Sequence, residues 1–491
     1  MNRKISSKRV RNVFAGEKPC LSQGLRQIPG KATKLALASV LVLSAPFSAF
    51  ASTKMGGVGV VIADEPNAAI AARNILEAGG SVADAATTLY FTLTVTYPVA
   101  ASLGGGGVCL HYDPKTRSAE SIDFLPRAAR AGGTMAVPGA IRGFAYLQEQ
   151  YGRLKWNEVV NPAAQLAASG FTLSRALADQ LKTHEAVVRK SGLLSGLFVN
   201  EDDELRSEGD AVRELSFAGT LGLIAGRGPL GFYSGPLAEE IEQASGSAGG
   251  AIALGDLHDY RAETAVAPAL DLGKSRVFTA SAQTGSGALA AKVIPSLGSL
   301  AGQRQPEALA MGARQAVEAG LQSFNVGPIP QDFGSTGFVV ADKEGELIAC
   351  GLTLSQPFGT GQEVARAGFA LAPAPKGAAG LAGAFLTPLI VTGSRGKDVL
   401  YAGVGAGGPD STSASFALGL ASLAHDTSIL DPTWQAAEKG SGTVNLIACK
   451  SGLIDDARGC IAAADPHGHG VAIQGQSQSG GGHGFLGLGL F

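Results

Sequence analysis

Apolar and polar positions alternate in blocks over residues 57–130, and the blocks predict strands and helices in turn. Residues 57–63 are a short apolar run that predicts a strand. Residues 65–80 repeat apolar positions at helical spacing and end in Gly–Gly, a common helix C-terminus. Residues 81–98 are almost entirely apolar, which is typical of a helix buried on all sides. Residues 104–124 hold two strand-like runs around a polar turn and predict a hairpin.

The rest of the chain changes from helices back to strands. Residues 137–270 are mostly helical by pattern, residues 275–325 combine a strand, a Gly/Ser/Thr loop and helices, and residues 335–475 return to strands with two helical stretches. This order predicts an α+β protein in which helices pack on sheets. Residues 475–491 are rich in glycine and predict a flexible tail. The length of 491 residues suits one large layered domain or two domains.

The first 51 residues have the composition of an export signal. Residues 1–34 carry nine Lys and Arg residues and one acid, Glu17, whereas residues 35–51 are uncharged and end in Ala–Phe–Ala. A basic stretch, an apolar run and small terminal residues predict a signal peptide that is cleaved after Ala51. The alternative is a signal anchor that stays in the membrane, but the apolar run is shorter than the roughly 20 residues that a spanning helix needs. We therefore expect a periplasmic or secreted protein.

Removal of this leader makes the protein clearly acidic. The whole chain has a net charge of −2, and the residues from 52 onward hold 30 Lys and Arg against 40 Asp and Glu, a net charge of −10. An acidic protein without a basic patch is a poor match to nucleic acid or to anionic membranes. We expect no nucleic-acid partner.

Four cysteines follow the leader. Cys109 and Cys350 each lie in an apolar, strand-like run, where a buried free thiol is the usual state. Cys449 and Cys460 flank a predicted loop between two strands. In an oxidising compartment they could form a disulfide, with two free thiols as the alternative.

Signals for a metal or a cofactor are weak. His467 and His469 are separated by one glycine, and a solvated turn explains that pattern better than a metal site does. No G-x-S-x-G motif occurs, and we interpret His111 as a half-exposed strand residue rather than as the base of a hydrolase triad. We expect no metal and no cofactor.

The stretch FGSTGFVV, residues 333–340, places Ser335 at the start of a predicted strand. A hydroxyl attacks poorly without a base, but a Ser at a chain N-terminus has one in its own α-amino group, whose pKa is about 8. Cleavage between Gly334 and Ser335 would create such a terminus, and Gly allows the turn that a peptide-to-ester shift requires. The alternative is an ordinary turn before a strand.

Soft motifs follow one another in a fixed order along the chain. They are ILEAGGSVADAATT, YPVAASLGGGGVCLHYD, VPGAIRGFAYLQEQYGRLKW, NPAAQLAASGF, FYSGPLAEEI, LHDYRAE, STGFVVADKEGELIACGLTLSQPFGTG, VGAGGPDS and AADPHGHG. From about Gly57 to about Gly470, this order resembles the γ-glutamyltransferase family of N-terminal-nucleophile hydrolases. The resemblance implies a four-layer αββα sandwich and a precursor that cuts itself into two associated fragments. The large fragment would be residues 52–334, and the small one residues 335–474.

The same resemblance implies roles for individual residues. Ser335 takes the position of the nucleophile, where the family has Thr, and Thr353 takes the position of a Thr whose hydroxyl orients the nucleophile. Gly407 and Gly408 fall where backbone N–H groups form the oxyanion hole, which stabilises the tetrahedral intermediate. The cut would fall between Gly334 and Ser335.

Several positions depart from the family pattern, and most of them bear on substrate recognition. A pocket without its charged partners would reject a γ-glutamyl α-amino acid, because two unpaired charges would be desolvated. The departures are Leu125 in place of the Arg that binds the α-carboxylate, with Arg127 as a weak substitute; Gly377 in place of the Asp that binds the α-amino group; Ala384 and Phe385 in place of two serines; and Ser355 in place of an Asn.

Together these features predict an exported, self-processing acyltransferase or amidase of γ-glutamyltransferase type. Its nucleophile would be the N-terminal Ser335, and its substrate would be a small molecule or peptide amide that need not be glutathione. The alternative is a secreted relative that stays uncut, has no activity, and has a structural or binding role.

Overall fold

The computed structural model describes residues 57–476, apart from residues 283, 284, 326, 362, 365, 397, 438, 439, 441 and 455–458. All the described residues belong to one compact unit. The predicted signal peptide and nearly all of the predicted tail lie outside the described residues.

Two antiparallel sheets form the centre of this unit. The larger sheet contains β1 (Gly59–Ala63), β2 (Gly106–Asp113), β3 (Ser118–Asp123), β8 (Glu263–Val266), β11 (Ser335–Asp342), β12 (Leu347–Thr353) and β19 (Val471–Gly475). Its strand order is β19-β1-β11-β12-β2-β3-β8. The smaller sheet contains β9 (Ala269–Leu272), β10 (Ser275–Thr279), β15 (Thr387–Gly393), β16 (Val399–Ala406), β17 (Thr443–Cys449) and β18 (Cys460–Ala463), in the order β18-β17-β16-β15-β10-β9.

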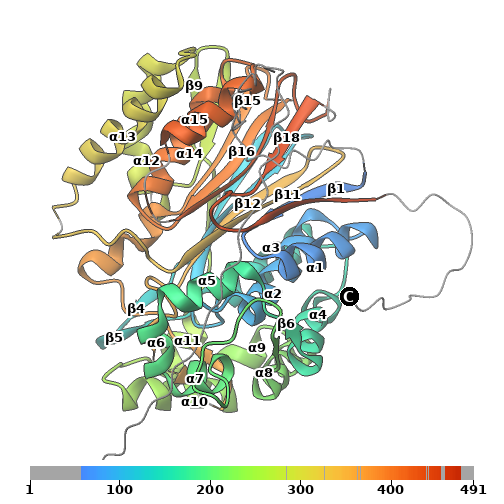
Figure 1. Cartoon of the computed structure of the whole chain (residues 1–491), viewed down its shortest axis with the longest axis vertical. Helices are drawn as coiled ribbons and strands as arrows, with labels where there is room; N and C mark the ends of the chain where they lie inside the picture. Colours follow the sequence, from blue (N-terminus) through green and yellow to red (C-terminus); the bar gives the residue numbers. More distant parts are fainter. Residues whose placement is uncertain are drawn as a thin grey trace, which may run out of the picture. The chain divides into compact units, whose positions relative to one another are not determined.

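Helices cover the outer face of each sheet, so the unit has four layers (Figure 1). Helices α1 (Pro66–Glu77) and α2 (Val82–Thr96) pack on strands of the larger sheet, and α14 (Pro409–Ser422) packs on β15, β16 and β17. Helices α12 (Gly285–Leu297) and α13 (Pro306–Gln322) lie on the same side as α14. The predicted α+β class and the αββα arrangement are confirmed.

The layers follow from the two-residue period of the strands, because successive side chains of a strand point to opposite faces of its sheet. In β11, Phe338 and Val340 pack in the cluster under α1 and α2. Val339 and Ala341 point the other way and pack in the cluster between the two sheets, together with Val404 of β16. A strand buried on both faces explains why residues 338–341 are a continuous apolar run.

Helix α2 is fully buried, as its apolar sequence predicts. Its first turn is held by a capping box: Ser81 Oγ accepts from the Asp84 N–H at 3.1 Å, and the Asp84 carboxylate accepts from the Ser81 N–H at 2.7 Å. Asp84 also accepts from Gln148 Nε2 at 2.7 Å, on α3 (Ala140–Tyr151). The buried carboxylate is therefore well hydrogen-bonded and joins two helices.

Further helices and short ladders complete the unit. The helices are α4 (Trp156–Ser169), α5 (Arg175–Thr183), α6 (Glu185–Lys190), α7 (Gly192–Phe198), α8 (Leu215–Arg227), α9 (Leu230–Tyr233), α10 (Pro236–Ser247), α11 (Leu254–Asp259) and α15 (Leu430–Ala437), with 3₁₀ turns η1 (Gly298–Leu300), η2 (Gly377–Phe385) and η3 (Thr427–Ile429). The ladders pair β4 (Arg127–Ala129) with β5 (Gly132–Val137), β6 (Phe171–Thr172) with β7 (Ala211–Val212), and β13 (Glu363–Val364) with β14 (Phe369–Ala370).

Two disulfides connect neighbouring strands. Cys449 of β17 is bonded to Cys460 of β18. Of the two alternatives that the sequence left open for this pair, the structure has the disulfide. Cys109 of β2 is bonded to Cys350 of β12, so the prediction of two buried free thiols is wrong. Both residues are buried, as expected, but they lie directly opposite each other on adjacent strands, with their Cα atoms 4.1 Å apart.

The environment of His111 also differs from the prediction. Its side chain is 4% exposed rather than half exposed. Its Nε2 lies 2.9 Å from Glu346 Oε1, and its ring stacks on Tyr151. The pattern of β2 did not reveal this, because α3 covers one end of the strand and brings Tyr151 onto it.

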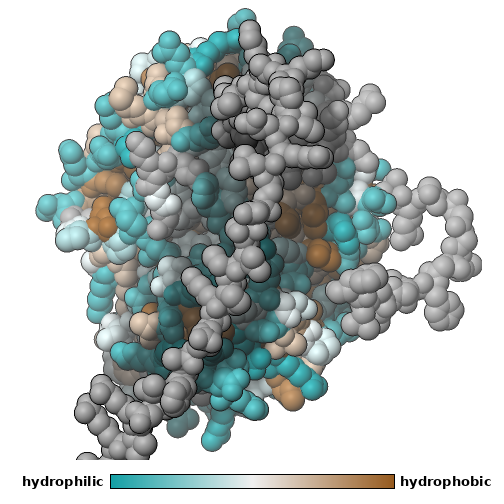
Figure 2. Space-filling view, viewed as in Figure 1, coloured by the Kyte–Doolittle hydropathy of each residue, from teal (hydrophilic) through white to brown (hydrophobic). Residues whose placement is uncertain are grey.

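Apolar side chains on the face drawn in Figure 2 form small separate patches within a mainly hydrophilic surface. The large hydrophobic residues that are exposed include Ile70, Leu230, Val266 and Met311, which come from different elements. None of the described helices is long and apolar enough to cross a membrane.

Candidate active site

The site begins where β11 and β12 pair at the edge of the helical layer. Ser335 is the first residue of β11 and lies directly opposite Thr353, the last residue of β12. Ser335 Oγ donates a hydrogen bond to Thr353 Oγ1 at 2.9 Å. The antiparallel register thus brings together the two hydroxyl groups that the sequence analysis assigned to nucleophile and orienting residue.

The hydroxyl of Thr353 is fixed by its other hydrogen bonds. It donates to the Phe333 carbonyl at 3.0 Å and accepts from the Ser355 N–H at 2.8 Å. Together with the bond from Ser335, these contacts use its one proton and both of its lone pairs. The position of Ser335 Oγ is therefore set by an acceptor that has little freedom to turn.

Gly334, the residue before Ser335, has a backbone that only glycine adopts easily. Its φ is +56°, and a Cβ atom built there would lie 2.3 Å from the carbonyl carbon and oxygen of Gln356. The Gly334 N–H donates to Asp332 Oδ1 at 2.7 Å, and the Gly334 carbonyl accepts from the Leu354 N–H at 3.0 Å. The carbonyl of the peptide bond to Ser335 is thus held by Leu354, and the preceding peptide unit is held by Asp332.

The loop that contains Gly407 and Gly408 lies against the same segment. The Phe333 N–H donates to the Gly407 carbonyl at 3.0 Å. A Cβ atom on Gly407 would lie 2.4 Å from Gly442 Cα, and one on Gly408 would lie 2.4 Å from the Gln331 carbonyl oxygen. The Gly408 N–H donates to Ser411 Oγ at 3.1 Å, so in this structure it is bonded within its own loop.

A buried carboxylate that the sequence analysis missed lies next to Ser335. Asp64 follows β1 and accepts from Thr336 Oγ1 at 2.6 Å, from Thr443 Oγ1 at 2.8 Å and from Asn445 Nδ2 at 2.8 Å. Burial raises the pKa of Asp64, and these hydrogen bonds partly counteract that effect. Because its partners come from β11 and β17, Asp64 ties both sheets together beside the candidate nucleophile.

Ser335 lines a cavity of about 230 Å³. Other residues that line it are Tyr97, Asp332, Gly334, Thr443 and His467. Burial, and then the nearby charges of Asp64, Asp332 and Glu65, raise the pKa of Tyr97 well above its usual range, so its phenol stays protonated. Ser335 thus lies beside a cavity whose walls carry several polar side chains.

The candidate substrate residues lie elsewhere. Arg127 pairs with Glu263 at 2.8 Å and stacks on Tyr260, and it is not among the described residues that line the cavity of Ser335. Ser355 is buried, with a φ of +63°, and its N–H is bonded to Thr353. Neither Arg127 nor Ser355 is among the described residues that line the cavity of Ser335.

Leu125, Ala384 and Phe385 stand at positions where the family pattern has residues that bind the substrate. A Cβ atom on Gly383 would lie 2.3 Å from Leu125 Cδ1, which places Leu125 against the η2 segment. Phe385, at the end of η2, stacks on Phe333 with ring centroids 5.1 Å apart. Ala384, like Phe385, is buried. Leu125, Ala384 and Phe385 thus pack against neighbouring side chains or the η2 segment, whereas Gly377 is exposed.

Described residues include no group of three or more His, Cys, Asp and Glu side chains that could hold a metal ion. His467 and His469 have separate carboxylate neighbours: His469 Nε2 lies 2.9 Å from Asp179, and His467 Nδ1 lies 3.8 Å from Asp465.

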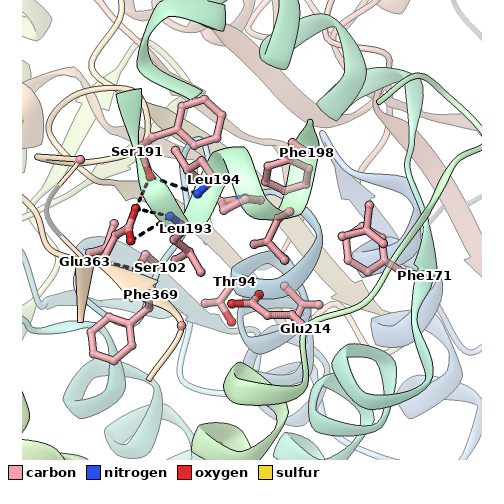
Figure 3. A pocket seen from close by; sticks show the side chains of 18 residues that line it. Thr94, Ser102, Phe171, Ser191, Leu193, Leu194, Phe198, Glu214, Glu363 and Phe369 are labelled. Carbon is pink, nitrogen blue, oxygen red and sulfur yellow. Dashed lines mark hydrogen bonds between the residues drawn. The ribbon is translucent and has the colours of Figure 1, made fainter. Parts of the chain in front are cut away.

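A second cavity is lined by Glu214, a buried carboxyl group whose pKa is raised (Figure 3). It lies among α2, α7 and the β13–β14 hairpin and has a volume of about 30 Å³, room for about one water-sized group. Glu363 accepts from the Leu193 N–H at 2.8 Å and from Ser191. Glu214, beside Thr94, is 9% exposed, and its Oε1 has no hydrogen-bond partner among the described residues. Burial, and then the charge of Glu363, raise the pKa of Glu214 to about 8.

This raised pKa predicts a pH-dependent stability. Glu214 holds its proton in the folded protein up to about pH 8, whereas in the unfolded chain it loses the proton near pH 4.5. Its contribution to the free energy of unfolding is therefore complete below pH 4.5 and is lost as the pH rises from there through 8. Glu214→Gln should therefore lose less stability than the parent between pH 5 and pH 9, by a few kcal/mol. Thermal unfolding across this range measures the difference, with the exposed Glu318→Gln as the control. Parallel curves for Glu214→Gln and the parent would contradict the assignment.

The family model described as Gamma-glutamyltranspeptidase matches residues 68–133 and 126–324, more than half of the chain. The chain belongs to the gamma-glutamyltranspeptidase family. The family match ends before Ser335, so the nucleophile region rests on the structure and on the motifs of residues 335–470.

Curated relatives resemble part of this family member. Its sequence is 34% identical over 225 residues to the glutathione hydrolase proenzyme of Escherichia coli, covering 42% of this chain and 39% of that protein. It is 31% identical over 276 residues to the glutathione hydrolase proenzyme of Pseudomonas aeruginosa, covering 52% and 48%. The matched region thus spans about two fifths to one half of the length of these relatives.

The fold match extends further than the sequence match. The crystal structure of a cephalosporin acylase from Bacillus halodurans superimposes with a TM-score of 0.62 at 17% identity, over 86% of this chain and 96% of that one. This gamma-glutamyltranspeptidase family member therefore shares its fold with that acylase over most of its length.

Proposed function

We propose that this protein is an exported acyltransferase or amidase that cuts itself before Ser335 and then uses Ser335 as its nucleophile. The observation that carries the proposal is the 2.9 Å hydrogen bond from Ser335 Oγ to Thr353 Oγ1, at the start of a strand that opens on a cavity. Residues 52–334 and 335–474 would then be the large and small fragments, which remain associated because β11 and β12 lie between β1 and β2 in one sheet.

Self-cleavage would begin with attack of Ser335 Oγ on the Gly334 carbonyl carbon. The hydroxyl loses its proton, the C–N bond to Ser335 breaks, and the nitrogen takes a proton to become the new α-amino group. Water then hydrolyses the resulting ester, which releases the Gly334 carboxylate and restores the hydroxyl. The left-handed conformation of Gly334 and the hydrogen bond from the Leu354 N–H to its carbonyl favour this step, because they hold the carbonyl in place.

Acyl transfer would then use the new terminus. The α-amino group of Ser335, with a pKa of about 8, takes the proton of Oγ as the hydroxyl attacks a substrate amide. An acyl-enzyme ester forms and the amine leaves with a proton; water or a second amine then takes the acyl group. Backbone N–H groups of Gly407 and Gly408 would stabilise the oxyanion, provided that the Gly408 N–H leaves Ser411.

The substrate we propose is an amide without the α-amino acid head of glutathione. Relatives are named glutathione hydrolases, and a structural neighbour is named a cephalosporin acylase. In this chain, Leu125 and Gly377 replace the charged residues of the family pattern, and Phe385 packs on Phe333 in the same region. Desolvating an ammonium and a carboxylate there without partners would cost several kcal/mol.

A non-catalytic, uncut protein is the second candidate. The bond from the Gly408 N–H to Ser411 Oγ favours it, because an oxyanion-hole donor that is already bonded does not stabilise an intermediate. This protein would keep the fold and the two disulfides and would act in a structural or binding role.

Export is supported by the two disulfides, because disulfides persist in oxidising compartments. The proposed leader is residues 1–51, and its cleavage after Ala51 would leave Ser52 as the first residue of the mature protein.

Variants of Thr353 test the proposal. Thr353→Val keeps the shape of the side chain and removes the hydroxyl that holds Ser335 Oγ, so we expect self-cleavage to slow by about 10²-fold. Thr353→Ser keeps the hydroxyl and should restore most of the rate. The rate is measured as the growth of the two fragments after cell-free synthesis. Equal rates for the parent and Thr353→Val would contradict the role of Thr353.

A further inference from the structure

Tyr97 lines the same cavity as Ser335, and its side chain is buried. Its hydroxyl group forms no hydrogen bond with any described residue. The hydroxyl of a buried tyrosine usually has a hydrogen-bond partner, because a polar group that is taken out of water without one loses free energy. A hydroxyl of this kind in a cavity wall is therefore available to a molecule that enters the cavity.

The backbone of Tyr97 is held by hydrogen bonds on both sides. Tyr97 follows the last turn of α2, and its N–H donates to the Leu93 carbonyl at 2.8 Å. Its own carbonyl accepts from the N–H groups of Ala100 and Ala101, each at 3.2 Å. Because the backbone is fixed and the ring is buried, the hydroxyl is positioned before any substrate arrives, which is the condition under which a donor stabilises a transition state best.

Other side chains in the wall of this cavity also have hydrogen-bond donors. The hydroxyl protons of Thr183 and Thr443 are already used in hydrogen bonds to described residues. Gln180 is half-buried and His467 is exposed, so burial holds neither of them as it holds Tyr97.

The charges near the cavity favour a neutral donor. Burial, and then the charges of Asp64 and Asp332, raise the pKa of Tyr97 well above its usual range. The phenol therefore keeps its proton over the pH range in which the α-amino group of Ser335, with a pKa of about 8, becomes a free base. A negative charge that develops beside these carboxyl groups needs a hydrogen-bond donor to offset their repulsion.

Self-cleavage has a donor of its own. The Gly334 carbonyl, which is attacked in that reaction, already accepts from the Leu354 N–H at 3.0 Å, and Leu354 is not among the described residues that line the cavity. An external acyl donor would enter through the cavity, where Tyr97 lies. The Gly408 N–H, the donor that the family pattern suggests, is bonded to Ser411.

We propose that Tyr97 is a catalytic residue of acyl transfer, whose O–H donates a hydrogen bond to the carbonyl oxygen of the acyl donor and to the oxyanion formed from it. This inference rests on the proposed acyl transfer by Ser335. When Ser335 Oγ bonds to the carbonyl carbon, its proton passes to the α-amino group and the π electrons move to the carbonyl oxygen. Tyr97 keeps its proton, and the oxyanion collapses as the leaving group departs.

The test uses p-nitrophenyl acetate, a small activated ester that forms the same kind of oxyanion when a hydroxyl attacks it. Acetylation of Ser335 in the processed protein is followed by mass spectrometry of the digested small fragment, which distinguishes Ser335 from surface lysines. Tyr97→Phe keeps the ring and removes only the hydroxyl, so we expect acetylation to slow by about 10²-fold. The rate of self-cleavage and the pH dependence of acetylation should not change.

Tyr401→Phe is the matched control, because Tyr401 is a buried tyrosine of β16 that is not among the described residues lining the cavity. Gln180→Met removes the competing amide donor and should slow acetylation far less than Tyr97→Phe does.

Three results would overturn this inference and leave the proposed function in place. They are equal acetylation of Tyr97→Phe and the parent, a larger loss in Gln180→Met than in Tyr97→Phe, and a loss of self-cleavage in Tyr97→Phe as large as the loss of acetylation, which would indicate a structural role. A parent protein that does not cut itself, or that cuts itself without becoming acetylated at Ser335, would overturn the proposed function and the inference with it.

Discussion

After self-cleavage, the two fragments are expected to remain joined by a covalent bond. Cys109 lies in the proposed large fragment and Cys350 in the small one, and their disulfide connects β2 with β12. Cys449 and Cys460 both lie in the small fragment, so their disulfide makes no such link. A denatured but unreduced sample should therefore show one species, heavier than the uncut chain by one water, and reduction should release two fragments.

Paired cysteine variants test this link. Replacing Cys109 and Cys350 together by Ser should separate the fragments without reductant, whereas replacing Cys449 and Cys460 together should leave them joined. Because Cys109 and Cys350 are fully buried, a mild reductant should not separate the fragments of the native protein. Alkylation in denaturant should find no free thiol in the protein from Ser52 onward. Fragments that separate without reductant in the parent protein would contradict this disulfide.

The link has a consequence for the active site. Thr353 ends the strand that contains Cys350, and Ser335 begins the neighbouring strand. The disulfide therefore anchors the pair of strands that positions the nucleophile to a strand of the large fragment. A crosslink of this kind commonly contributes about 2–4 kcal/mol to the free energy of unfolding.

Local patterns in the sequence predicted helices and turns well where the composition of the segment alone indicates whether it is buried or exposed. The apolar run of residues 81–98 is the buried helix α2, and the polar turn at residues 113–118 joins β2 to β3. The family resemblance placed Ser335 and Thr353, which the register of β11 and β12 then brings within 2.9 Å. These features depend on short-range spacing or on a known order of motifs.

Features that depend on distant strands were not predictable from the sequence. The partners of Asp64 lie 272 to 381 residues away in the chain, so no local pattern marks it as part of the site. The bond between Cys109 and Cys350 spans 241 residues and depends on which strands are neighbours. The raised pKa of Glu214 arises from burial by several elements and from Glu363, which a sequence does not place together.

Removal of the hydroxyl of Ser335 should abolish self-cleavage. Ser335→Ala keeps the backbone of β11 but has no oxygen to attack the Gly334 carbonyl, and a peptide bond in water is otherwise stable on the time scale of an expression experiment. Ser335→Thr keeps the hydroxyl, and its added methyl group restricts the rotamer, so we expect this variant to cut. The pair of variants separates the chemistry of the hydroxyl from any effect on folding.

The most direct test of the account is the intact mass of the reduced protein, expressed from Ser52 onward in an oxidising compartment, for the parent, Ser335→Ala and Ser335→Thr. The account predicts two fragments that meet between Gly334 and Ser335 in the parent and in Ser335→Thr, and a single uncut chain in Ser335→Ala. A single uncut mass in all three proteins, or the same cut in Ser335→Ala, would contradict the central claim and would favour a family member that has kept the fold without the chemistry.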